Sequence, residues 1–384
     1  RDCVGCNDCF GCVNLRQSSY RIFNKQYSKE DYKKEIEKMN LETISGLEKA
    51  REKARIFWNT QPVKYHQGLK NLNSTGSYVT NCKNVKDSFL MREGENMRYC
   101  QYLQVPKNKD CYDAFAWGAN MELHYETCLS GGNTFNLKFC DNCWPNCKNL
   151  EYCAHMFSSS DCFGCVGLKK KQYCIFNKQY GKEEYLKMVE KIKEHMNEMS
   201  YVDKKGSVYK YGEFFPIEHS QFGYNNSTAI QYFPINKEKA KEEGYPWIEV
   251  SRGEYKITKK IDDLQDSIDE IGNDILQEIM ECGNCKNPYR ILENELLFYK
   301  KENLPLPTMC HDCRFKRRIK DRLKFELYER SCMCAGTTDE KGIYKNTVKH
   351  VHDSEPCGEK FKTGYSLDRP EIVYCEKCYQ QEVY

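Results

Sequence analysis

Short segments in which polar and apolar residues alternate recur between residues 81 and 180. Their starts lie 11 to 14 residues apart, and Asn, Lys, Gly, Asp or Ser bounds each one. Examples are NCKNVKDSF from Asn81, KNKDCYDAF from Lys107 and TFNLKFCDNC from Thr134. Alternation bounded by turn residues predicts short, half-buried strands. Because hairpin-type Asn-Gly and Asp-Gly dipeptides are absent from these segments, we expect a right-handed parallel β-helix-like solenoid with about two segments per coil.

A longer repeat frames this region. Residues 8–32 and 161–185 share DCFGCV, IFNKQY and a following Lys-Glu, at an offset of 153 residues. A match of this length indicates a duplicated structural unit. After each IFNKQY block the apolar spacing changes to that of a helix, and Ser28 with Asp31 resembles a capping box. We therefore predict a mainly β chain in which helices flank the solenoid, including a further helix over residues 46–58.

Changes in pattern along the chain suggest five regions. Residues 199–262 are aromatic and punctuated by Pro216, Pro234 and Pro246, which favours an extended segment packed on its neighbours over a disordered linker. The predicted boundaries are 1–60 (first repeat unit with helices), 61–198 (solenoid, second repeat unit and helix), 199–275 (aromatic connecting segment), 276–330 (first zinc module) and 331–384 (second zinc module). Since residue 1 is Arg, we expect that the natural N-terminus precedes it.

Composition narrows the partners. The 384 residues carry a formal net charge of +3, so any basic surface must be local. The mean hydropathy of −0.81 and the lack of a long apolar run predict no membrane association. Fifteen of the 24 cysteines precede residue 175 and nine follow residue 280, where they form CxxC pairs. Such pairs in a large, Lys-rich chain favour a reducing cytoplasm with metal thiolates over a disulfide framework.

The cysteines of the solenoid have two interpretations. They are either small buried hydrophobes or ligands, since Cys3, Cys6, Cys9 and Cys12 resemble an iron–sulfur or zinc run. The repeat favours packing, because only the last two recur, as Cys162 and Cys165. A site made by Cys140, Cys143 and Cys147 with a fourth partner stays open.

The clearest chemical signal begins at residue 282. Two CxxC knuckles, Cys282 with Cys285 and Cys310 with Cys313, are joined by 24 residues. This spacing is typical of a tetrahedral zinc site with four thiolates, which leaves no open coordination position and is therefore structural. His311 lies inside the second knuckle, and we expect it to face solvent.

A second zinc module is predicted over residues 332–378, for a total of about two Zn²⁺. Cys357, Cys375 and Cys378 would be completed by either Cys332 or Cys334, and His352 is a further alternative ligand. His350 lies in the same stretch. Residues 349–357, KHVHDSEPC, also raise the alternative of a nuclease on a zinc fold, although no strand-placed Asn-His pair accompanies them.

A basic cluster follows Cys313 directly. Its six cations within nine residues are Arg314, Lys316, Arg317, Arg318, Lys320 and Arg322. At helical spacing Arg314, Arg317 and Arg318 share a face. This segment is either a solvated helix face beside a zinc site or a phosphate-binding surface.

These residues together resemble a known group of proteins. FYKKENLPLPTMCHDCRFKRR is similar to a treble-clef zinc-ribbon repeat, and YSLDRPEIVYCEKCYQQEV is similar to its partner module. Along nearly its whole length the chain resembles large cysteine-rich proteins of reduced-genome candidate-phylum bacteria, whose function is not established. The resemblance implies zinc binding by Cys282, Cys285, Cys310, Cys313, Cys375 and Cys378 in a bacterial cytoplasm. The insertion between Cys334 and Cys357 departs from the shorter ribbon pattern.

Three classes of function remain. The first is a nucleic-acid-associated protein that contacts DNA or RNA through the zinc modules and the basic segment. The second is a scaffold for other proteins. The third is a metal-dependent nuclease or other hydrolase with carboxylates such as Asp110, Asp113, Glu122 and Glu126 in the solenoid groove. No nucleophile elbow, P-loop or dinucleotide fingerprint occurs, so no catalytic residue is assigned and a binding protein is favoured over an enzyme.

Overall fold

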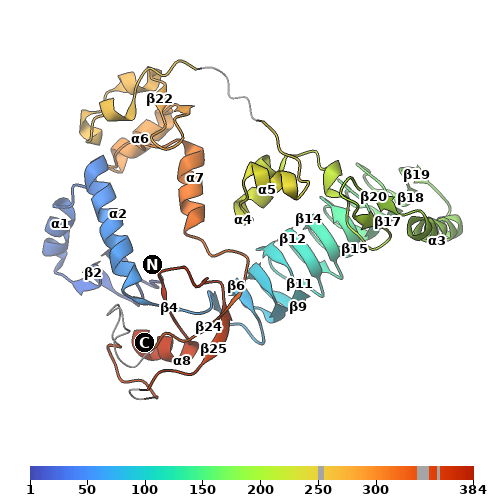
Figure 1. The fold of residues 1–384 in the computed structure, drawn as a ribbon, viewed down its shortest axis with the longest axis horizontal. Helices are drawn as coiled ribbons and strands as arrows, with labels where there is room; N and C mark the ends of the chain where they lie inside the picture. The colour runs from blue at the N-terminus through green and yellow to red at the C-terminus, as the bar shows by residue number, and fades with distance from the viewer. Residues whose placement is uncertain (250–254, 335–345, 353–354) are drawn as a thin grey trace.

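The chain is mainly strand, with helices at its ends and between its modules. The computed structural model describes residues 1–249, 255–334, 346–352 and 355–384 (Figure 1). In this part of the chain the eight α-helices are α1 Lys29–Glu37, α2 Ile44–Asn59, α3 Lys182–Glu198, α4 Ala229–Tyr232, α5 Lys237–Glu242, α6 Glu293–Lys301, α7 His311–Lys320 and α8 Glu376–Val383. None of these described helices is long and apolar enough to cross a membrane. The prediction of a mainly β chain with helices is confirmed.

One sheet of fifteen strands fills the middle of the molecule. Its strands are β5 Gly68–Leu69, β6 Gly76–Thr80, β7 Lys83–Lys86, β8 Ser88–Arg92, β9 Gly94–Arg98, β10 Gln101–Leu103, β11 Asn108–Lys109, β12 Tyr112–Gly118, β13 Met121–Glu122, β14 Tyr125–Gly131, β15 Thr134–Asp141, β16 Lys148–Glu151, β17 Ser160–Phe163, β18 Gln172–Ile175 and β19 Lys178–Gln179. Six parallel strands, β9, β12, β14, β15, β13 and β11, pair in a closed ring. The remaining pairs are also parallel, apart from the antiparallel end pair β18–β19.

Paired positions in this sheet lie close together along the chain. Val79 pairs with Met91, Tyr112 with Tyr125, and the offsets range from 11 to 14 residues. This offset equals the spacing between the recurring sequence segments. Consecutive segments therefore lie side by side, and Figure 1 shows them as an advancing row of strands.

The backbone changes direction about every third residue. Asn81 and Asn84 have φ values of 55° and 54°, and such left-handed residues recur at nearly every third position as far as Asn177. Asn and Asp accept this conformation better than most side chains, which explains their frequency here. The residue after each left-handed one points inward: Cys82 and Val85 are both buried. A three-residue period thus places the core.

The duplicated unit has the same register in both copies. In the first copy β1 (Asn7–Phe10) pairs in parallel with β2 (Ser19–Ile22), which pairs antiparallel with β3 (Lys25–Gln26). Strands β17, β18 and β19 repeat each pairing at an offset of 153 residues. Helices α1 and α3 follow, and the Ser28 side chain accepts a hydrogen bond from the Asp31 N–H as predicted. The interpretation of the sequence repeat as a structural duplication is confirmed.

The aromatic connecting segment packs on the sheet. Its short strands β20 (Tyr201–Val202) and β21 (Val208–Tyr209) precede Tyr211, whose hydroxyl donates to Glu151 at 2.9 Å. Tyr152 contacts the rings of Tyr211 and Phe215. Farther on, Tyr232 of α4 stacks on Phe325, with ring centroids 4.7 Å apart. The segment is therefore an ordered cover over part of one face.

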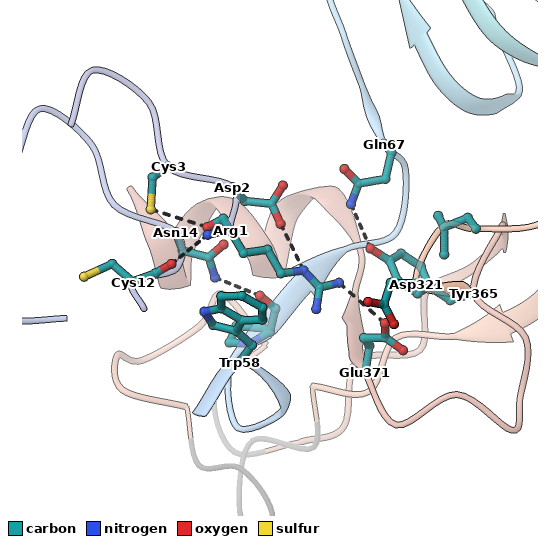
Figure 2. A network of polar contacts seen from close by, with 12 residues as sticks. Arg1, Asp2, Cys3, Cys12, Asn14, Trp58, Gln67, Asp321, Tyr365 and Glu371 are labelled. Atoms are coloured by element: carbon teal, nitrogen blue, oxygen red, sulfur yellow. Dashed lines mark hydrogen bonds and ion pairs between the residues drawn. The ribbon is translucent and has the colours of Figure 1, made fainter. Parts of the chain in front are cut away.

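The C-terminal part contacts the N-terminal unit. Its strands are β22 Met280–Glu281, β23 Pro288–Tyr289, β24 Tyr328–Ser331, β25 Lys360–Thr363 and β26 Ile372–Tyr374. Strand β26 pairs in parallel with β4 (Pro62–Lys64), far away in sequence. Figure 2 shows the polar contacts beside this joint: the Arg1 guanidinium lies between Asp2 and Glu371, and Gln67 donates to the Tyr365 hydroxyl. Pairing and polar contacts thus hold the two ends of the chain together.

Candidate metal centres

The first centre is formed by a hairpin and a helix N-terminus. Strands β22 and β23 pair antiparallel around the knuckle that carries Cys282 and Cys285. Cys310 is the N-cap of α7 and Cys313 lies in the first turn of that helix. The four sulfurs lie within 4.8 Å of one another. The structure therefore brings together all four cysteines that the spacing predicted, while His311 is exposed as expected.

The geometry of this cluster matches tetrahedral zinc. A Zn–S bond of about 2.3 Å gives a tetrahedron with edges of about 3.8 Å. The Sγ atoms of Cys285 and Cys310 are 3.7 Å apart. Backbone and amide N–H groups surround the sulfurs: Cys310 N donates to Cys282 Sγ at 3.3 Å, and Asn284 Nδ2 donates to Cys313 Sγ at 3.3 Å. These donors favour thiolates, the form that binds a metal.

The thiols of this centre differ in acidity. Burial raises the pKa of Cys282, but backbone N–H groups of Cys285, Cys310 and Asn284 that donate to its sulfur outweigh burial and lower the pKa to about 6. Burial and the neighbouring thiols raise the pKa of Cys310 to about 12. The cluster thus holds one thiolate readily, whereas a full set of four negative sulfurs needs a cation among them.

The second centre draws on three separate segments. Its sulfurs come from Cys332 after β24, Cys357 before β25, and Cys375 with Cys378 at the start of α8. Cys357 Sγ lies 3.9 Å from Cys375 Sγ, again close to a tetrahedral edge. Backbone N–H of Cys375 donates to Cys332 Sγ at 3.2 Å. Of the two front ligands that the sequence left open, the structure places Cys332 in this group.

A third group lies directly beside the second. It consists of Cys334, His350, His352 and again Cys378, whose ligand atoms also lie within 4.8 Å of one another. His352 was a predicted alternative ligand, but it meets Cys334 here instead of replacing a cysteine in the second centre. His350 was missing from the predicted ligand set. The His-x-His spacing near Cys357 was the available signal, because an imidazole is as common a zinc ligand as a thiolate.

The cysteines of the sheet are not gathered in this way. Among the described residues the three groups above are the ones whose ligand atoms converge, and none includes a solenoid cysteine. Cys140 is fully buried, and its sulfur lies 3.2 Å from the Lys138 carbonyl and 3.4 Å from the Leu150 carbonyl. Cys153 has the same two kinds of contact. Their thiols therefore satisfy backbone at the bends, and the alternative site at Cys140, Cys143 and Cys147 is not formed.

The basic cluster is divided by its contacts. Arg314 is half-buried, with Nη2 at 3.1 Å from Glu295 Oε1 and Nη1 donating to Tyr299 at 2.9 Å. Arg322 lies over the Tyr232 ring at 4.3 Å from the centroid. Arg317 is 3.5 Å from Glu48 of α2. The helix face shared by Arg314 and Arg317 is thus engaged within the chain, whereas Lys316, Arg318 and Lys320 are exposed on α7.

Comparison with known proteins adds no relative: no protein family, no curated protein and no solved structure matches this chain. The site is therefore interpreted from its own geometry. Three clusters of cysteine and histidine can hold metal ions of the zinc type.

Proposed function

We propose that residues 66–179 form a β-solenoid with one recurring segment per turn. The offset of 11 to 14 residues between paired positions supports one segment per turn, in place of the two expected from the sequence. The three-residue alternation of left-handed and buried positions also supports it. A stack of such turns is rigid along its length and suits a protein that presents a surface.

The first two cysteine centres are structural zinc sites in this proposal. Thiolate sets at tetrahedral spacing carry it, and four protein ligands leave no position for substrate. Metal analysis of protein purified without added metal should return zinc, and the double variant Cys310→Ser, Cys313→Ser should lose one ion per chain. Cys162→Ser, a solenoid change of the same chemistry, should lose none. A folded C-terminal part that contains no zinc would contradict the proposal.

The proposed role is that of a nucleic-acid-binding protein in a reducing compartment. The observation that carries it is α7: this helix starts at the metal ligand Cys310, and Lys316 and Lys320 lie one turn apart on its exposed side. A metal-anchored helix holds such cations in a fixed place relative to a phosphate backbone. All 24 cysteines are free thiols, which is consistent with a cytoplasmic setting. The resemblance to cysteine-rich treble-clef proteins belongs to the same proposal.

A salt titration with generic DNA and RNA tests this role. Phosphate contact makes log K fall with log salt, and each cation lost should reduce that slope by about one. The double variant Lys316→Glu, Lys320→Glu should therefore flatten the slope by about two. Lys169→Glu, Lys170→Glu changes the net charge equally at exposed positions of the solenoid and should leave the slope unchanged. Equal effects of both variants, or no binding at low salt, would contradict the proposal.

A protein scaffold is the second candidate. One specific observation favours it: an apolar groove of about 440 Å³ on the sheet, lined by Val105, Trp117, Leu129 and Trp144 among others. Trp117 is 48 % exposed although it is large and apolar. Exposed apolar grooves on repeat proteins suit an apolar side chain of a protein partner. If nucleic acid does not bind, Trp117→Ser is the variant with which to examine this candidate.

A further inference from the structure

We propose that residues 332–378 hold two metal ions that share the sulfur of Cys378, so that the chain carries three zinc ions. The proposal rests on the zinc proposal above and adds a binuclear centre to it. One ion would have Cys332, Cys357, Cys375 and Cys378 as ligands, and the other Cys334, His350, His352 and Cys378. A thiolate has lone pairs for two metal ions, and four ligands complete each tetrahedron.

The hydrogen bonds of the two histidines direct unprotonated nitrogens into the third group. His352 Nδ1 lies 2.6 Å from the backbone oxygen of Glu355, which can only accept, so Nδ1 carries the proton. His350 Nε2 lies 2.7 Å from a carboxylate oxygen of Glu382, so it too is the donor. In the neutral rings His350 Nδ1 and His352 Nε2 are then lone pairs.

Both lone pairs point at the same sulfur. His350 Nδ1 is 3.0 Å and His352 Nε2 is 3.3 Å from Cys334 Sγ, and Asn346 Nδ2 donates to that sulfur at 3.1 Å. One thiol proton can serve only one of the two nitrogens. His352 Nε2 is also 3.3 Å from Cys378 Sγ. Two nitrogen lone pairs and two sulfurs that converge on one point are the donor set of a soft divalent cation.

The outer contacts are those of ligating histidines. A metal-bound imidazole usually donates its other N–H to a carboxylate or a carbonyl, which fixes the ring. The side chains of His350 and Glu382 are 0 % and 2 % exposed, so this pair is held away from water. Thr347 N also donates to Glu382 at 2.6 Å and fixes the carboxylate. Such an arrangement orients the ring of His350 before an ion binds.

Charge and distance agree with a shared sulfur. Four thiolates around one Zn²⁺ leave a buried charge of −2, whereas the five thiolates and two ions of the joint centre leave −1. The nitrogen–sulfur distances of 3.0 to 3.3 Å are a few tenths below the edge of about 3.6 Å that Zn–N and Zn–S bonds require. An ion would therefore spread these donors only slightly.

Counting metal in matched variants tests the third ion. The intact chain should contain three zinc ions, His352→Ala should contain two, and Cys285→Ser, in the separate first centre, should also contain two. Cadmium-113 NMR of the cadmium-loaded chain then separates these two variants. Two resonances should be coupled to each other through the shared sulfur in the intact chain and in Cys285→Ser, and the coupling should vanish in His352→Ala.

The outcomes distinguish this proposal from the one on which it rests. Three ions with a coupled pair support the binuclear centre. Two ions in the intact chain, or three without coupling, overturn the shared sulfur while the zinc proposal stands. An intact chain without zinc overturns both.

Discussion

At the scale of single residues, the core is set by which side chain follows a left-handed one. Such a position must be small and must satisfy the backbone at the bend. Cysteine does both: Cys100 is fully buried and its sulfur lies 3.4 Å from the Arg98 carbonyl. Ser88 makes the equivalent contact with the carbonyl of Lys86 at 2.7 Å. The abundance of cysteine in this half of the chain thus has a packing cause that does not involve metal.

His124 is the exception among these inward positions. It is 1 % exposed, its Nδ1 lies 3.3 Å from Thr127 Oγ1, and its Nε2 has no partner among the described residues. Burial lowers its pKa to about 4. As pH falls below about 6.5, the unfolded chain takes up a proton that the folded chain does not. This histidine therefore destabilises the fold in acid.

We predict that His124→Leu removes this acid sensitivity. Between pH 6.5 and pH 4.5 the native chain should lose on the order of 2 to 3 kcal/mol more folding free energy than the variant, from about 1.4 kcal/mol per pH unit. Urea unfolding followed by far-ultraviolet circular dichroism at the two pH values measures the difference. Any loss of metal in acid affects both proteins alike. The same pH dependence in both would contradict the prediction.

At the scale of elements, amide side chains connect successive turns of the sheet. Asn73 Nδ2 donates to Asn84 Oδ1 at 2.9 Å, Asn84 to Asn96 at 3.1 Å, and Asn96 to Asp110 at 3.1 Å. A second ladder joins Asn136, Asn149 and Asp161. The same residue type therefore serves the left-handed bend and the contact between turns.

We predict that the two roles of Asn84 can be separated. Asn84→Gly keeps the bend at φ 54° but removes two ladder bonds, and should cost about 1 to 2 kcal/mol. Asn84→Ala also puts a strained residue in the bend and should cost a further 1 to 2 kcal/mol, roughly the penalty of a left-handed residue. Hydrogen exchange of β7 to β9 measures both. A glycine variant as well protected as the native chain would show that the ladder adds no stability.

At the scale of the whole molecule, the metal modules and the N-terminal unit depend on each other. Strand β26, which pairs with β4, ends at the ligand Cys375. Tyr379 of α8 donates to Asn14 at 3.0 Å. Figure 1 shows α2 and α7 together on the other side of the ring, where Arg317 lies near Glu48. The fifteen-stranded sheet, in contrast, has a continuous core of its own from Val79 to Cys174.

We predict that removal of metal loosens the two ends of the chain and spares the sheet. Small modules with little core of their own unfold when the metal leaves. A chelator should therefore increase hydrogen exchange in residues 280–331, 360–383 and 62–64, measured by mass spectrometry, while residues 76–175 stay protected. Adding zinc back should restore protection. Equal loss of protection throughout would show that the sheet also depends on metal.

Spacing along the chain determined the features whose residues are close neighbours. The duplicated unit, the helices that follow it and the first cysteine centre were predicted from sequence, because a CxxC knuckle fixes two ligands within one turn. The alternation also predicted strands, although it did not predict one segment per turn. That number depends on which segments pair, and pairing is a contact between residues about 12 positions apart.

Only the tertiary structure decided the contacts between distant segments. The spacing of Cys332 and Cys334 does not tell which sulfur meets Cys375, because their partners arrive from residues 350–378 along separate paths. The same reason explains the basic cluster: Arg314 and Arg322 look equivalent to Lys316 in sequence, but Glu295 and Tyr232 engage them in the folded chain. Local pattern fixes the backbone and the nearest ligands, whereas shared ligands and paired charges depend on how separate segments pack.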